Sequence, residues 1–169
     1  MNAAHLHLVV NHLPIIFPLV GVIIMLTGFV SKSAPVKRTA LLIFILGALS
    51  AVAAMTTGER AEDVVGKIDG TSEPYIEVHE EKAEVFAVFS YILGGISLLG
   101  LWFSFKQKNF SNLISIGTLV FAIATLFFAQ QTGTSGGEIR HTEIRTADNA
   151  TPPSAVRPFY QKNKKDHDD

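Results

Sequence analysis

The chain has 169 residues and a formal net charge of −1; 48% of its residues are hydrophobic and only 17% are charged. This length is enough for one domain or one small bundle. The chain has no cysteine, which excludes disulfides, thiolate metal sites, iron–sulfur clusters and attachment of a c-type haem through C-x-x-C-H.

Four uncharged apolar stretches follow one another along the chain. They cover residues 13–30, 39–57, 85–105 and 110–129. As a helix, each is about long enough to cross a hydrocarbon core of roughly 30 Å. The sequence therefore predicts an all-α membrane protein, a bundle of four transmembrane helices within residues 1–145, with the lipid bilayer as its surroundings.

The connecting segments alternate in charge. The short turns after the first and third spans carry lysine and arginine without acids, whereas the outer loop 58–84 is mainly acidic and no Lys or Arg precedes the first span. The positive-inside rule places the two short turns in the cytoplasm and both termini outside. In a bacterium this is a multi-pass inner-membrane protein with periplasmic termini. The polar tail 146–169 has a composition typical of disorder.

A short internal repeat is present. Thr57-Gly58 and Thr132-Gly133 stand 75 residues apart, and each begins a run that ends in an acidic residue; His5 and His79 stand 74 apart. The pattern predicts two repeated helical hairpins around a pseudo-two-fold axis, with any shared site near that axis. The segment TGTSGG is expected to end the last helix in a glycine cap, which would fold His141 back over the bundle.

Five of the six histidines are predicted to lie on the outer face. They are His5, His7, His12, His79 and His141. His12 is closest to the membrane, because a helix is expected to begin at Pro14. Two neutral imidazoles from facing helices commonly hold a b-type haem or another metal in a bundle core.

The leading hypothesis is haem b bound by His12 with His79 or His141. The same three residues are the candidates for a copper or zinc site, and a third interpretation is that no cofactor binds. From spacing alone, His5 and His7 are expected to be interfacial polar residues. Acidic side chains at the same membrane edge are candidates to orient the histidines. They are Glu62, Asp63, Glu80 and Glu138.

Signatures of most enzyme classes are missing from the sequence. It has no Ser–His–Asp order, no H-E-x-x-H and no nucleic-acid-binding motif. An electron-transfer protein or an accessory subunit of a larger membrane complex is therefore favoured over a stand-alone enzyme.

The chain resembles the bacterial membrane proteins grouped as domain of unknown function 2231, whose first span begins with a motif like H-P-x-x-V-H-F-P. The segment His7–Pro14 keeps both histidines and the final proline, and departs at Leu8, Asn11 and Leu13. The family's T-G-x-x-G-G ending, with a nearby histidine, is echoed by residues 132–141.

The resemblance implies four helices and no settled function. Relatives in that family are sometimes fused to Rieske-type or cytochrome c-like domains, which implies electron transfer on the outer face with a periplasmic partner protein. Because His7 is a retained motif position, the resemblance adds it to the cofactor-binding candidates.

Overall fold

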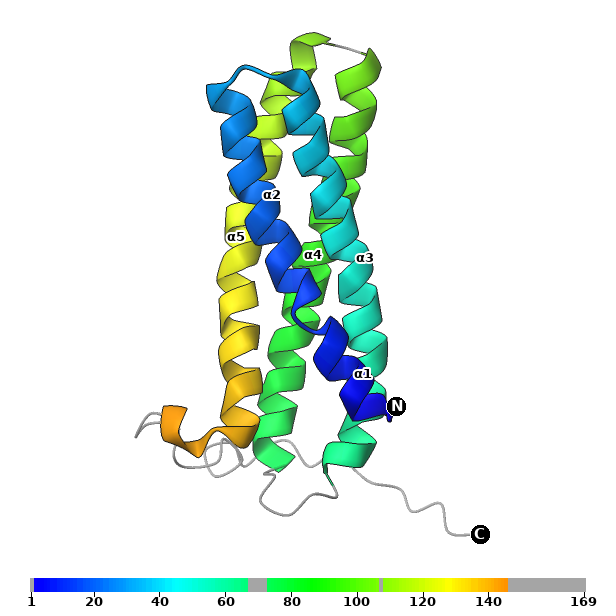
Figure 1. Ribbon diagram of the computed structural model, residues 1–169, viewed down its shortest axis with the longest axis vertical. Helices are drawn as coiled ribbons and strands as arrows, with labels where there is room; N and C mark the ends of the chain where they lie inside the picture. The colour runs from blue at the N-terminus through cyan, green and yellow to red at the C-terminus, as the bar shows by residue number, and fades with distance from the viewer. Residues whose placement is uncertain (1, 67–72, 107, 146–169) are drawn as a thin grey trace.

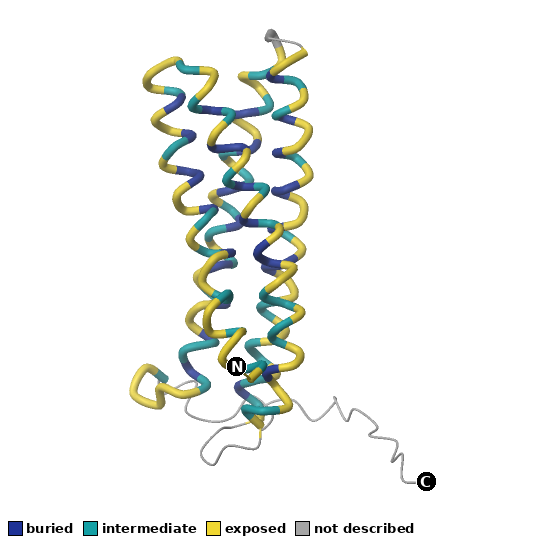
Figure 2. The backbone as a smooth tube through the Cα atoms, turned by 45° about the vertical axis from the view of Figure 1, so that its right-hand side comes forward, coloured by how far each residue is buried: buried dark blue, intermediate teal, exposed yellow. Residues whose placement is uncertain are grey.

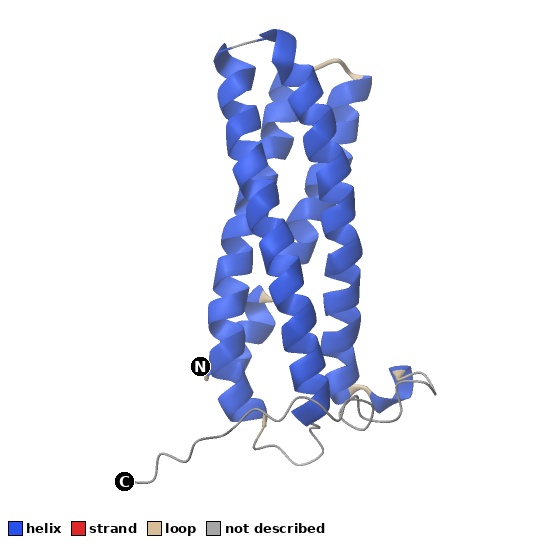
Figure 3. Cartoon of the chain, turned by 180° about the vertical axis from the view of Figure 1, so that it is seen from behind, coloured by secondary structure: helices blue, strands red, loops and turns tan. Residues whose placement is uncertain are grey.

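The computed structural model describes residues 2–66, 73–106 and 108–145. Within these ranges all regular structure is helical (Figures 1 and 3), which confirms the all-α prediction. The elements are α1 (Ala3–Val10), α2 (Leu13–Val30), α3 (Ala34–Val65), α4 (Glu73–Lys106), α5 (Lys108–Arg140) and the 3-10 turn η1 (Thr142–Ile144).

The long helices stand side by side as a bundle, with the start of α1 and the end of α5 toward the same end (Figure 1). Four helical stretches are long and apolar enough to cross a membrane. They are Ala3–Val30, which joins α1 and α2, then Ala34–Val65, Glu73–Lys106 and Phe110–Arg140. This indicates a multi-pass membrane protein, as the composition predicts.

The helices extend beyond the predicted spans at the end that holds the histidines. Much of the segment 58–84 that the sequence assigns to the outer loop is helical, because α3 continues to Val65 and α4 already begins at Glu73. The length of an apolar run indicates how much of a helix lies in the hydrocarbon core, but it does not indicate where the helix ends. Ala, Glu and Arg favour helix in water, so a helix can continue beyond the apolar run. The predicted tail 146–169 lies outside the described residues.

The glycine-rich segment TGTSGG lies inside α5, which runs to Arg140. The expected glycine cap is therefore wrong. Glycine lowers helix propensity by only about 1 kcal/mol, a cost that close packing can offset.

A break at Asn11 and His12 separates α1 from α2. Pro14 has no N–H to donate to the preceding turn, so the helical hydrogen-bond ladder is interrupted there. α2 begins at Leu13, one residue before the predicted start. The break lets α1 pack on α3, while α2 contacts both α3 and α5.

Buried positions recur every three or four residues along the long helices, and the exposed positions face outward (Figure 2). Such a 3.5-residue repeat is the pattern of left-handed coiled-coil packing. On α4 the buried series is Phe86, Ser90, Leu93, Ser97, Gly100 and Ser104. Small and hydroxyl residues dominate it, so α4 approaches its neighbours closely.

At the end opposite the histidines, basic side chains are satisfied by neutral groups. Buried Lys37 donates to Asn112 Oδ1 and lies 5.2 Å from the centroid of the Phe29 ring. The Arg38 guanidinium donates to the Ser104 carbonyl at 2.7 Å and to Ser104 Oγ at 3.1 Å. The short basic turns are thus anchored to the bundle.

Candidate histidine site

His7 is fixed by its Nδ1 atom to the helix beside it. Nδ1 lies 3.1 Å from the carbonyl oxygen of Ala54 and 3.2 Å from Thr57 Oγ1, both on α3. A carbonyl only accepts hydrogen bonds, and the Thr57 hydroxyl has the carbonyls of Ala53 and Ala54 to donate to, at 2.8 and 3.1 Å. We therefore assign the ring proton of neutral His7 to Nδ1.

His79 on α4 is held in the same way by α5. Its Nδ1 lies 3.1 Å from Ser135 Oγ, and the Ser135 hydroxyl donates to the Thr132 carbonyl at 3.0 Å. With the serine proton directed to Thr132, we assign the ring proton of neutral His79 to Nδ1. One turn away, Thr132 Oγ1 donates to the Lys82 carbonyl at 3.0 Å and joins the two helices.

Both rings are consequently the tautomer that leaves a lone pair on Nε2. The side-chain hydrogen bonds that hold the two rings run through Nδ1. An imidazole whose Nδ1–H is fixed by a neighbouring oxygen and whose Nε2 is free has the arrangement of a metal ligand.

A glycine lies against the edge of each ring. A Cβ on Gly136 would be 2.9 Å from Cε1 of His79, and a Cβ on Gly58 would be 3.3 Å from Cε1 of His7. Cε1 lies between the two ring nitrogens, and the next atom that a Cβ would approach is Nδ1, at 3.5 Å for Gly58 and 3.3 Å for Gly136. The glycines therefore let each ring lie close against the helix that its Nδ1 contacts.

His7 and His79 lie at the same end of the bundle, and both are half-buried. A positive charge on His7 is felt at His79, and a positive charge on His12 is felt at His7. His7 precedes the first predicted span and His79 precedes the third; His7 is hydrogen-bonded to α3 and His79 to α5. By these contacts His79 corresponds to His7, whereas the internal repeat in the sequence aligns His79 with His5.

The other histidines within residues 2–145 are exposed. His12 occupies the N-cap of α2 without a side-chain capping bond, and His5 lies on the open face of α1. His141 precedes η1, with Nδ1 2.8 Å from Glu143 Oε1. Backbone hydrogen bonding within Glu143 and then the His141 side chain hold the pKa of Glu143 below its usual range.

The three predicted metal ligands His12, His79 and His141 are not gathered into one site. Across residues 2–66, 73–106 and 108–145, no group of three or more His, Asp or Glu side chains is placed to hold a metal ion.

The predicted orienting carboxylates are scattered around this end of the bundle. Glu62 and Asp63 are exposed on α3, Glu80 is exposed on α4, and Glu138 is buried on α5. The Nδ1 atoms of His7 and His79 are instead bonded to hydroxyl and carbonyl oxygens.

Sequence reasoning missed the residues that fix the two rings. The signal for them is a hydroxyl residue followed by glycine, which occurs as Thr57-Gly58 and as Ser135-Gly136. The repeat noted in the sequence contains both pairs but aligns the first with Thr132-Gly133, one turn too early for the contact with His79.

Comparison of the chain with protein-family models, with curated proteins and with solved structures finds no match. The resemblance to domain of unknown function 2231 therefore stays a prediction.

Proposed function

We propose that this protein is a bacterial inner-membrane electron-transfer protein that binds a b-type haem through His7 and His79 near the periplasmic face. The observation that carries the proposal is that the His7 and His79 rings have the same hydrogen-bonding arrangement. Each has its Nδ1 bonded to a neighbouring helix, which leaves Nε2 as the nitrogen for a ligand, and a positive charge on His7 is felt at His79. His7 replaces His12 as the first ligand because His12 is exposed and has no orienting bond.

The donor set suits haem better than zinc. Haem takes two neutral imidazoles from facing helices, whereas zinc sites use three or four protein ligands. When bound, haem supplies one-electron exchange at its iron. The protein's part is to hold the tautomers through Thr57 and Ser135, and to seat the two rings against Gly58 and Gly136.

An absorption spectrum tests the cofactor. Detergent-purified protein from haem-replete cells is expected to show a Soret band, with sharpened α and β bands after dithionite reduction. His7→Ala and His79→Ala should each remove or alter these bands, since each removes one ligand. His5→Ala is the matched control, because it changes an exposed histidine on the same short helix as His7 and should leave the spectrum unchanged.

The alternatives give different outcomes. A colourless protein that carries copper in elemental analysis, and loses it in His79→Ala, would indicate a two-histidine copper site. A colourless and metal-free protein would refute the proposal. It would favour a cofactor-free accessory subunit of a larger membrane complex, to be found by co-purification.

The proposed orientation rests on the basic turns, which lie at the end of the bundle opposite the histidines. The natural chain has no cysteine, so single cysteines report topology without background. In intact spheroplasts, Thr142→Cys should react with a membrane-impermeant maleimide and Ser31→Cys should react only after lysis. The reverse pattern would place the histidine site in the cytoplasm.

A further inference from the structure

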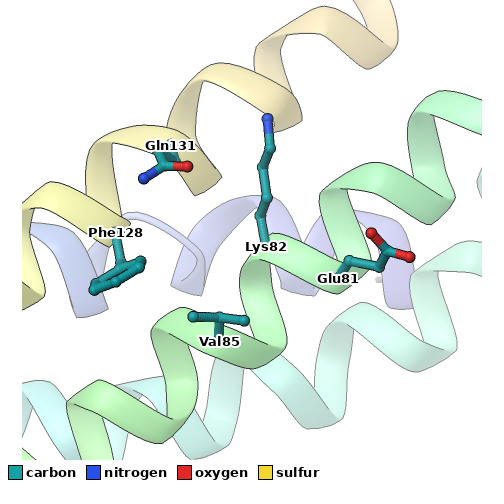
Figure 4. A pocket seen from close by; sticks show the side chains of 5 residues that line it. All are labelled: Glu81, Lys82, Val85, Phe128 and Gln131. Carbon is teal, nitrogen blue, oxygen red and sulfur yellow. The ribbon is translucent and has the colours of Figure 1, made fainter. Parts of the chain in front are cut away.

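A small pocket opens between α4 and α5 beside the histidine site (Figure 4). Its volume is about 220 Å³. The residues that line it are Glu81, Lys82, Val85, Phe128 and Gln131. Phe128 and Val85 face each other across the groove, Lys82 extends from α4 toward α5, and Glu81 lies at the far edge (Figure 4).

The pocket straddles the predicted membrane boundary. Val85 begins the third predicted span and Phe128 lies at the end of the fourth, whereas Lys82 and Gln131 lie just outside the spans. Its floor is therefore apolar and its rim polar, an arrangement that suits a molecule with a polar head and a tail in the lipid.

The pocket adjoins the proposed redox centre. Lys82 and Gln131 lie about one helical turn from His79 and Ser135 on the same helices. The positive charge of Lys82 is felt at the His79 ring, and the Thr132–Lys82 hydrogen bond fixes the two helices at this level.

Hydrogen-bond donors line the pocket, but the surrounding acidic residues disfavour an anionic ligand. Lys82 offers an ammonium that forms no salt bridge in the part of the chain that the structure describes, and Gln131 offers an amide. Around Lys82, the first turns of α4 carry Glu77, Glu81 and Glu84. This acidic surface would repel a phosphate, so a neutral oxygen acceptor fits better than a phospholipid head group.

We propose that this pocket binds the head group of a membrane quinone. The Phe128 ring supplies a flat wall for a quinone ring, and Lys82 and Gln131 supply donors for a quinone carbonyl. The volume is below the roughly 300–1,000 Å³ of sites that enclose a whole drug-sized ligand, so the pocket accommodates one ring and leaves the isoprenoid tail in the membrane. This inference extends the proposed function. It rests on the haem proposal only for the function of the bound quinone, since quinone binding itself needs no haem.

An adjacent residue provides a matched control. Gln131 lines the pocket while Gln130 is exposed. Titration calorimetry of the full chain in detergent with a decyl-chain ubiquinone gives the Kd. Gln131→Leu and Phe128→Leu should each weaken binding by about three- to tenfold, since each removes one hydrogen bond or one aromatic contact. Gln130→Leu should bind like the unchanged protein.

Equal affinities of Gln131→Leu and Gln130→Leu, or no binding by the unchanged protein, would overturn the inference. Loss of a co-purifying phospholipid in Gln131→Leu, with quinone affinity unchanged, would also overturn it and assign the pocket to lipid. The two proposals fail separately. A colourless protein that binds quinone with the expected pattern refutes only the haem, and a haem protein without quinone affinity refutes only this site.

Discussion

The contact between α3 and α4 at Gly94 gives the sharpest test of the packing. An ideal Cβ on Gly94 would lie 2.5 Å from Cβ of Ala48. Carbon atoms pack at about 3.5–4.0 Å, so Gly94→Ala requires α3 and α4 to separate locally by about 1 Å. Both atoms are fixed to helix backbones, so no side-chain rotation relieves the contact. The adjacent Gly95 is exposed, and a Cβ there would meet no other atom within 4 Å.

The two alanine variants should move stability in opposite directions. Each gains about 1 kcal/mol of helix propensity. Gly94→Ala also incurs overpacking of about 1–3 kcal/mol, so its net effect is a loss of up to about 2 kcal/mol. Gly95→Ala has only the gain, so the two variants should differ by about 1–3 kcal/mol.

Unfolding in sodium dodecyl sulfate, followed by circular dichroism and by Trp102 fluorescence, measures this difference. The comparison within one pair of neighbouring glycines cancels effects of detergent and of helix propensity. If Gly94→Ala proved as stable as Gly95→Ala, the close approach of α3 and α4 would be refuted, and with it the coiled-coil arrangement of the core.

Three further predictions concern the site and the helix ends. Gly136→Ala places a Cβ 2.9 Å from the His79 imidazole, whereas a Cβ at Gly133 would be 3.7 Å from its nearest atom. The haem content per protein should therefore fall in Gly136→Ala and stay unchanged in Gly133→Ala. Equal haem contents in the two variants would contradict the proposed site. Lys32 ends α2 with φ of 51°, a conformation that favours glycine, so Lys32→Gly should raise the free energy of unfolding by about 1 kcal/mol in a detergent titration; a loss of stability would argue against this turn geometry. The pKa of Glu143 is held low by backbone hydrogen bonding within its own residue and then by His141. The stability that ionised Glu143 gives the turn is therefore present above the usual carboxyl pKa and is lost as pH falls through the lowered pKa. An NMR titration should show that low midpoint and its upward shift in His141→Ala, and an unmoved midpoint would exclude the ion pair as a cause.

The existence and order of the helices could be predicted because the length of an apolar segment can be compared directly with the thickness of the membrane. The first span, 13–30, coincides with α2, and proline placed its start within one residue. The outward extension of α3 and α4 could not be read in this way, since polar helix ends carry no apolar signal. The 3.5-residue repeat was present in the sequence, with Thr118, Thr125 and Thr132 seven residues apart and buried on α5, and it could have predicted the buried faces.

Composition and spacing along the chain are enough to predict a helical protein with several membrane-length segments and a cluster of histidines toward one end. Which histidines are held by neighbouring helices depends on the folded bundle, because the bonds that fix His7 and His79 join residues about fifty positions apart. The break before Pro14 turns α1 onto α3, brings His7 to Thr57 and leaves His12 outside. That choice depends on the path of the backbone through the bundle, and no local pattern encodes it.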